Sequence, residues 1–335
     1  MRGDVSRLIF LDSSVNTHGD STKVICPTQA FSVASHERMS LTLQSFSMRR
    51  NWYNINPTNN TGYLFVDSTH YEFSIAPGVY SSFSALGTAL KAAITATITA
   101  NTALQAIVAS ISTVAYSAVT RKFTLTFTMG TGHSSTQVIF RSYHIKPGGT
   151  LPTGVSQKGG FSDLHEILGC TPIRAASTTN SMKATSTNVL ESPFVASLNT
   201  LDAIYIHLTT LQTGNWMSTG HESHIPESLR LVESSLFARI PFDDSTFTEA
   251  HEVVQFEDNG GDAFQSMLNR KSLDNLEIRV TDMRGRTLAT MNPSQAEAGL
   301  MGFRMCLRWD VYFGRPPAQP QAKPPIGGIP PLSKA

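Results

Sequence analysis

The sequence predicts a mainly β protein, an antiparallel sandwich with a helical and loop insertion and an extended arm at each end. Segments in which apolar and polar residues alternate recur along the chain, whereas only one long segment has helical periodicity. Long connectors rich in Gly, Ser and Thr separate these segments. The last 22 residues, 314–335, include seven prolines, which neither extend a helix nor join the interior of a sheet.

The clearest predicted strand is the last one, at 303–313. Its odd-numbered residues are all apolar, and its other face carries Arg304, Cys306, Arg308, Asp310 and Tyr312. Residues 122–129 alternate in the same way and, with the segment that follows up to Ile145, predict a hairpin.

Two further strands carry local signals. Residues 276–281 alternate and are followed by a turn that places Gly285 where a positive φ is cheap. In the strand near 37–49, the apolar parity switches between Leu43 and Phe46, which predicts a bulge near Gln44.

Helix is predicted at two places. Near 82–100, apolar residues recur every four positions after a serine-rich start, so a capped helix is expected there. A short second helix is predicted at 161–169, with Ser162 as its N-cap and Gly169 at its end. Residues 146–160 and 171–192 are predicted to be long polar connectors, which are uncommon unless they make contacts.

The composition limits the classes of function. Basic and acidic residues are balanced, 26 against 25, so no charged surface for direct nucleic-acid binding is indicated. Only 15% of residues are charged, and Ser and Thr number 73. A weakly charged surface of this kind suits a protein that is covered by partners.

Compartment and membrane signals are equally limited. The N-terminus lacks the apolar run of a signal peptide, and the most apolar stretch, 85–116, is too interrupted by polar residues to predict a transmembrane segment. Cys26, Cys170 and Cys306 have no metal-binding or disulfide spacing, so we expect buried thiols in a reducing compartment.

No pattern in the sequence predicts catalysis, a cofactor or a metal. His221 and His224 are three residues apart and would need a third ligand, such as His251, to hold a metal. Their segment reads as a loop and lacks the order of a metalloprotease motif, so solvated histidines are the preferred interpretation. We therefore predict a protein that is not an enzyme.

Two stretches resemble a known class of protein. In the first, a strand leads into the turn at 53–56 and the pair Asn59–Asn60, and a later strand ends in Pro77–Gly78 before a helix. In the second, the segment "LDNLEIRVTDMRGRTLATM" precedes the long last strand. Together they resemble the minor capsid and penton-type proteins of large icosahedral DNA viruses, in particular phycodnavirus-like viruses, and of virophages.

The resemblance implies a jelly-roll sandwich without catalysis or cofactor, located in the virion and assembled in the host cytoplasm. On this interpretation residues 1–28 form an N-terminal arm and 29–313 the jelly roll, with an insertion at about 81–200. Residues 314–335 form a Pro-rich C-terminal arm. The implied partners are capsomers of the major capsid protein and other minor capsid proteins. If the chain is a penton, it is also expected to form a homopentamer at five-fold vertices.

The expected interface residues lie in the two arms. An extended, Pro-rich arm binds through main-chain hydrogen bonds and spaced side chains, and proline reduces the entropy that it loses on ordering. In the N-terminal arm the expected contacts are Leu8 and Phe10. In the C-terminal arm they are Pro316, Pro317, Ile326, Ile329 and Leu332.

Two functions of other classes remain open. A jelly-roll module that binds carbohydrate or a receptor would gather exposed aromatic residues at one loop end, but Trp52, Trp216 and Tyr312 are scattered along the sequence. A metal-dependent hydrolase would depend on His221 and His224.

Overall fold

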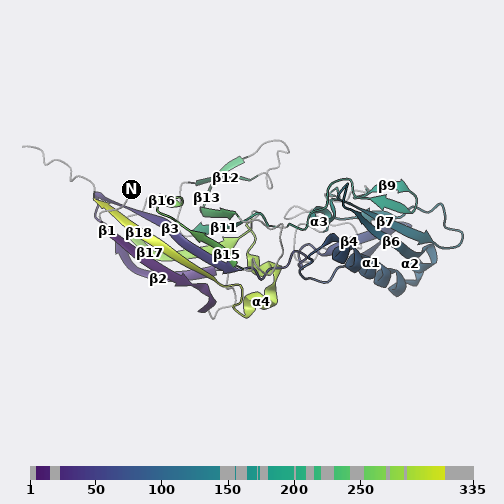
Figure 1. The fold of residues 1–335 in the computed structure, drawn as a ribbon, viewed down its shortest axis with the longest axis horizontal. Helices are drawn as coiled ribbons and strands as arrows, with labels where there is room; N and C mark the ends of the chain where they lie inside the picture. The colour runs from purple at the N-terminus through teal and green to yellow at the C-terminus, as the bar shows by residue number, and fades with distance from the viewer. Residues whose placement is uncertain are drawn as a thin grey trace, which may run out of the picture.

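The structure is a computed structural model of the whole chain. It describes residues 5–15, 23–143, 155, 164–171, 173, 180–199, 201–208, 215–219, 230–241, 253–268, 272–282 and 285–313. These residues form two lobes that follow one another along the long axis of the molecule (Figure 1). One lobe is built from both ends of the described chain, and the other from its middle.

The first lobe is a sandwich of two antiparallel sheets. The first sheet has the order β1-β18-β3-β15, with β16 also paired to β3, and the second has the order β14-β11-β17-β2. The strands of the first sheet are β1 (Val5–Asp12), β3 (Glu37–Arg49), β15 (Val253–Glu257), β16 (Gln265–Leu268) and β18 (Phe303–Phe313). Those of the second are β2 (Lys23–Ser32), β11 (Ala203–Leu208), β14 (Leu236–Pro241) and β17 (Ser272–Thr281).

The order of these strands is that of a jelly roll. Because β15 and β16 lie end to end along β3, they act as one interrupted strand, and the sandwich then has eight strands in chain order. Numbered along the chain, the sheets read 1-8-3-6 and 2-7-4-5, so the first strand pairs with the last, the second with the seventh, and so on inward. A ribbon folded on itself in this way is a jelly roll. The predicted fold class is confirmed.

The predicted bulge in β3 is also confirmed. The pairing of β3 with β18 shifts by one residue at Gln44, since Cys306 lies opposite Ser45 whereas Leu307 lies opposite Leu43. The shift keeps Phe46 and Met48 in the core on one side of the bulge. On the other side, Met39, Leu41 and Leu43 face the same core.

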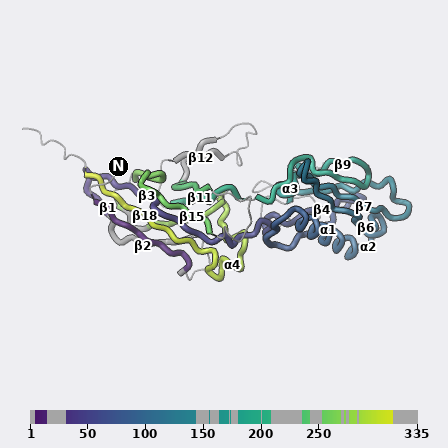
Figure 2. Tube along the Cα trace, viewed as in Figure 1, coloured from purple at the N-terminus to yellow at the C-terminus, as the bar shows by residue number. Residues whose placement is uncertain are grey.

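The N-terminal segment is not a free arm as predicted. All eight residues of β1 pair with β18, from Val5 opposite Val311 to Asp12 opposite Arg304. In the second sheet, β2 pairs with β17. Ile9 and Leu11 also pack against the sandwich core, which ties β1 down through side chains as well as backbone. Figure 2 shows the first and last strands side by side.

The second lobe is inserted between β3 and β11. Its core comprises residues between Ile55 and Leu198, so the insertion begins well before the predicted position near 81. One sheet has the order β5-β4-β8 and the other β6-β7-β10-β9. The strands are β4 (Thr61–Val66), β5 (Thr69–Ser74), β6 (Val108–Ser117), β7 (Lys122–Met129), β8 (Ile139–Arg141), β9 (Lys183–Ser186) and β10 (Val189–Glu191).

Two local predictions in this lobe are wrong. The expected hairpin at 122–145 does not form, because β7 pairs with β6 and β10 whereas β8 pairs with β4 in the other sheet. The expected connector at 171–192 contains the paired strands β9 and β10. In both cases the short strands complete a sheet whose other strands come from elsewhere in the lobe.

The predicted long helix is confirmed as α1 (Phe83–Ala100), which begins at the N-cap Ser82 and is followed by α2 (Thr102–Ile107). By length and composition alone, α1 could cross a membrane. Its residues Leu86, Leu90, Ile94 and Ile98 are buried in the core of the lobe, the arrangement of a core helix. The short helix α3 (His165–Leu168) ends at Gly169 as predicted, but its N-cap is Leu164, and Ser162 lies outside the described residues.

The asparagine-rich turn at the start of the insertion is held by hydrogen bonds of its own side chains. Asn59 accepts a hydrogen bond from the Asn56 backbone and donates one to the Asn54 carbonyl. Asn54 in turn accepts from the Tyr80 backbone N–H at 2.9 Å and donates to the Tyr80 carbonyl. The turn is thereby linked to the segment that precedes α1.

The remaining elements are short. They are a β12–β13 pair (Asn215–Thr219 and Arg230–Ser234), the 3-10 turns η1 (Ser13–Val15) and η3 (Leu288–Met291), and α4 (Pro293–Glu297). Gly285 has a positive φ of 75°, as the turn signal predicted.

Candidate functional site: the outer face of the first sheet

The outward-facing residues of β1, β18, β3 and β15 form cross-strand rows. One row is Phe10, Cys306, Ser45 and Glu257, and the next is Asp12, Arg304, Ser47 and Gln255. In both rows the residue on β3 is a serine, and the side chains at the two ends of the row, on β1 and β15, are larger. The centre of the sheet therefore forms the floor of a trough, whose walls are β1 and β15.

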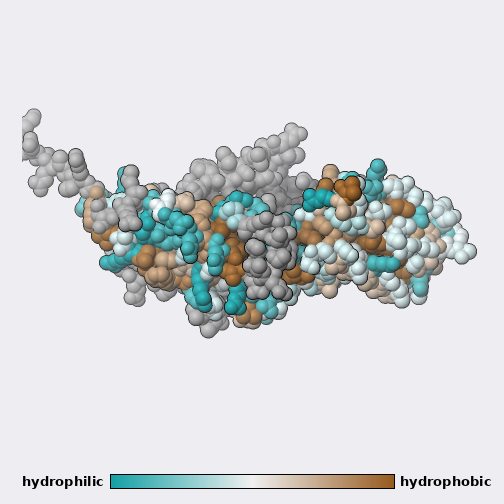
Figure 3. All heavy atoms as spheres, viewed as in Figure 1, coloured by the Kyte–Doolittle hydropathy of each residue, from teal (hydrophilic) through white to brown (hydrophobic). Residues whose placement is uncertain are grey.

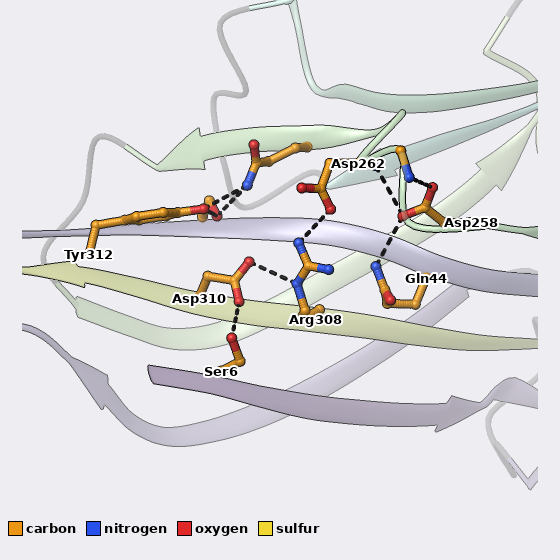
Figure 4. A network of polar contacts seen from close by, with 10 residues as sticks. Ser6, Gln44, Asp258, Asp262, Arg308, Asp310 and Tyr312 are labelled. Atoms are coloured by element: carbon orange, nitrogen blue, oxygen red, sulfur yellow. Dashed lines mark hydrogen bonds and ion pairs between the residues drawn. The ribbon is translucent and has the colours of Figure 1, made fainter. Parts of the chain in front are cut away.

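Half of this trough is filled by the protein itself. The turn between β15 and β16, residues 258–264, reaches back over the sheet, and Asp262 accepts a hydrogen bond of 2.5 Å from the Arg308 guanidinium. Arg308 also donates to Asp310 at 2.9 Å, and Asp310 accepts from the Ser6 hydroxyl (Figure 4). Beneath this network Ser40 and Thr42 are fully buried. We call this part the closed half.

The closed half is held by further bonds at both ends. Gln265 donates to the Tyr312 hydroxyl at 2.8 Å, and Gln44 donates to Asp258 at 3.3 Å (Figure 4). Asp258 accepts from the backbone of Gly261 and Asp262, which fixes the shape of the turn.

In the closed half, Arg308 pairs with two carboxylates, those of Asp262 and Asp310. The Asp310 side chain is completely buried and that of Arg308 is 11% exposed. Burial would lower the pKa of Arg308, but its hydrogen bonds to Asp310 and Asp262 raise it overall. The Arg308 hydrogen bond lowers the pKa of the Asp262 carboxyl, so both partners are held in their charged forms.

The other half of the trough is an open groove. It has a volume of about 420 Å³ and is lined, among others, by Phe10, Ser45, Phe256, Glu257 and Cys306. A second hollow of about 400 Å³ adjoins it and shares Asp12, Ser47, Gln255 and Arg304. We call the two together the open groove. Its entrance carries the pair Arg304–Asp12, whose nitrogen and oxygen are 3.1 Å apart.

The groove wall formed by β1 is apolar and exposed. Phe10 is 75% exposed and Leu8 is 55% exposed, because even-numbered residues of β1 face outward. These are the two residues of the N-terminal segment that the sequence singled out for contacts with partners. The structure places them on an edge strand of a sheet instead of on a free arm. Hydrophobic and hydrophilic patches adjoin on the surface of this lobe (Figure 3).

The opposite edge of the sheet, formed by β15 and β16, also exposes apolar side chains. Val253 on β15 is 42% exposed and Met267 on β16 is 44% exposed. Together with Leu8 and Phe10, they give the first sheet apolar side chains at both of its edges.

The insertion lobe contains a separate cluster of aromatic and basic side chains. The Arg141 guanidinium lies 3.6 Å from the centre of the Phe65 ring and contacts His70 Nε2 at 2.7 Å. Burial, and secondarily the Arg141 charge, lower the pKa of His70, which favours a neutral ring that accepts the Arg141 hydrogen bond. The cluster links all three strands of the β5-β4-β8 sheet through side chains.

The other residues that the sequence singled out are buried, belong to the closed half or lie outside the described residues. Among the described residues, no group of three or more His, Cys, Asp or Glu could hold a metal. His221, His224 and His251 lie outside the described residues, as do Pro316, Pro317, Ile326, Ile329 and Leu332. Trp52 is buried in the sandwich core, Tyr312 belongs to the closed half, and the side chain of Trp216 is outside the description. Cys170 and Cys306 are buried free thiols, and burial raises the pKa of each.

No family model and no curated protein matches the sequence. Two solved structures are similar over nearly the whole chain. The mavirus penton protein has 9% identity and a TM-score of 0.40, covering 92% of this chain and all of that one. A chain of the Sputnik virophage structure has 12% identity and a TM-score of 0.37, covering 94% of this chain and 99% of that one.

These structures include a penton protein and a chain from a virophage, the class of protein that the sequence resembles. At these identities and TM-scores the likeness carries no argument about function. The proposal that follows is therefore built on the residues of this chain.

Proposed function

We propose that the chain is a structural component of an icosahedral virus capsid, a minor capsid protein that binds neighbouring capsomers and catalyses no reaction. The observation that carries this proposal is a complete eight-strand jelly roll with exposed apolar side chains at both edges of one sheet. Jelly rolls are the usual building block of viral capsids, and exposed apolar residues grouped on one face favour protein contacts. The partners would be capsomers of the major capsid protein and other minor capsid proteins.

Purified particles of the source virus test this proposal. Quantitative mass spectrometry should find the chain in a constant ratio to the major capsid protein, and chemical crosslinks should join the two. A non-structural protein from the same genome is the control for contamination. Particles that lack the chain, or contain it in variable traces, would contradict the proposal.

A second candidate, the penton, is supported by the two apolar edges. A contact between Leu8 and Phe10 of one copy and Met267 of the next would be head-to-tail, and such contacts close into rings when the rotation allows. Light scattering should then give the mass of a pentamer, and Met267→Ser should reduce it to a monomer. Thr113→Ser, on an exposed strand position of the insertion lobe, is the matched control. A wild-type monomer would exclude the ring and leave the minor capsid role.

A further inference from the structure

The closed half and the open groove differ in whether a described segment of the chain covers the floor of the trough. In the closed half, the floor residues Ser40 and Thr42 are sealed by a turn of the same chain. In the open groove, Ser45 and Ser47 form the same kind of floor, yet no described segment crosses it. The open groove is therefore shaped for an extended segment that comes from elsewhere.

The lining indicates the chemistry of that segment. Phe10 provides an exposed aromatic ring, and Ser45 and Gln255 provide groups that donate hydrogen bonds. Aromatic grooves with such donors bind Pro-rich segments, whose backbone carbonyls are unpaired and whose rings pack on aromatic faces. Glu257 on the β15 wall adds a negative charge.

The chain itself contains a segment with this chemistry. Residues 314–335 follow β18 and hold seven prolines, three basic residues and no acidic residue. They also provide Ile326, Ile329 and Leu332 at a spacing of three, which places them on one side of a polyproline helix. Polyproline rise is about 3.1 Å per residue, so 22 residues can span roughly 68 Å.

The direction of β18 decides which copy supplies the segment. The groove lies at Arg304 and Cys306, whereas the arm leaves at Phe313, seven residues and roughly 23 Å further along the strand. To reach the groove of its own copy, the arm would have to reverse its direction. However, Arg315 and Pro316 each precede a proline, which favours extended backbone at these two positions. Extended backbone there would continue the direction of β18, away from the groove, which favours the arm of a second copy.

We propose that the open groove binds the Pro-rich C-terminal arm, residues 314–335, of a second copy of this chain. Phe10 receives the prolines and isoleucines, and Ser45 and Gln255 donate to the backbone carbonyls of the arm. The inference deepens the proposed function by naming one partner segment, and it can be tested without any particle.

A labelled peptide of residues 314–335 provides the first test. It is titrated by fluorescence anisotropy against a chain that ends at Phe313, which keeps every described element of both lobes. We expect saturable binding that Phe10→Ser weakens about tenfold, since an aromatic contact of that size is lost. Phe313→Ser is the matched control, because Phe313 is also exposed, at 53%, on the same sheet but outside the groove. Absence of binding, or equal weakening by both variants, would overturn the proposal.

The full chain provides the second test. Light scattering should show an average mass that rises with concentration. Removal of 314–335 should abolish the rise, and Phe10→Ser should shift it to concentrations about tenfold higher. If the full chain stays monomeric and also excludes the peptide, its own arm occupies the groove, and the second copy is refuted. Because neither experiment involves a particle, a failure here leaves the capsid proposal to its own test.

Discussion

The closed half and the open groove are neighbouring parts of one sheet face with the same backbone and the same small floor residues. They differ in what lies above the floor. In the closed half, a turn brings Asp262 onto Arg308 and excludes solvent from Asp310. In the open groove, Arg304 is an exposed counterpart of Arg308 on the same strand, with 76% of its side chain in solvent. The comparison shows that a polar sheet face can be part of the structure at one end and a surface for binding at the other.

The largest expected difference concerns these two arginines. Arg308→Ala leaves the Asp310 carboxylate buried without its main partner, and removing one partner of a buried ion pair costs about 3–5 kcal/mol. Arg304→Ala, the matched control, breaks only an exposed pair with Asp12 and should cost about 0–1 kcal/mol. Urea unfolding followed by tryptophan fluorescence measures both. Equal losses for the two variants would show that the closed half is not a distinct structural unit.

Much of this sheet could be predicted from the sequence. The alternation in β18 assigned its apolar residues from Phe303 to Val311 to the core, and the parity switch in β3 located the bulge at Gln44. Phe313, which the alternation also places on the inner face, is 53% exposed. Both signals are local, because the period of two reports which face of a strand is buried. The same alternation could not show that Asp310 is fully buried, since the turn that covers it lies about 50 positions earlier in the sequence.

The boundary of the insertion could not be predicted for a similar reason. Strands β4 and β5 have ordinary strand patterns, and nothing in a period of two tells which sheet a strand joins. The pairing of the N-terminal strand could not be predicted from a local pattern, because its partner, β18, lies at the other end of the described chain. Leu8 and Phe10 are exposed on this strand, and their role in contacts with partners stays a prediction. The groove itself requires the register of four strands, which no local pattern provides.

Lowering the pH is expected to have an effect of intermediate size on the free energy of unfolding. Because the pKa of Asp262 is lowered in the folded protein, the unfolded state takes up this proton first as the pH falls. The stabilisation by Asp262 is therefore complete above about pH 5 and is lost as the pH falls below its ordinary value of 3.8. Asp262→Asn should cost about 1.5–3 kcal/mol at pH 7 and flatten the decline in stability between pH 5 and 3.

Thermal unfolding across that pH range measures this difference. The control is Asp202→Asn, because Asp202 pairs with Arg239 on the surface, where both side chains are about half exposed. Its variant should cost at most about 1 kcal/mol at pH 7, less than Asp262→Asn. A parallel decline in Asp262→Asn and the wild type would mean that the turn is not held by this charge.

The smallest expected effect on stability is in the open groove, at Phe10→Ser. Phe10 is 75% exposed on an edge strand, so its replacement removes little buried area and should change the free energy of unfolding by less than about 0.5 kcal/mol. Ile9→Ser is the contrast, since Ile9 packs against the sandwich core and should cost about 2 kcal/mol or more. Both can be measured by urea unfolding of the chain that ends at Phe313. A large loss of unfolding free energy in Phe10→Ser would mean that this ring stabilises the monomer. If Phe10→Ser leaves the free energy of unfolding nearly unchanged but weakens peptide binding, then Phe10 acts in assembly and its neighbour Ile9 in folding. This is what we expect of an edge strand that turns one face to the core and the other to a partner.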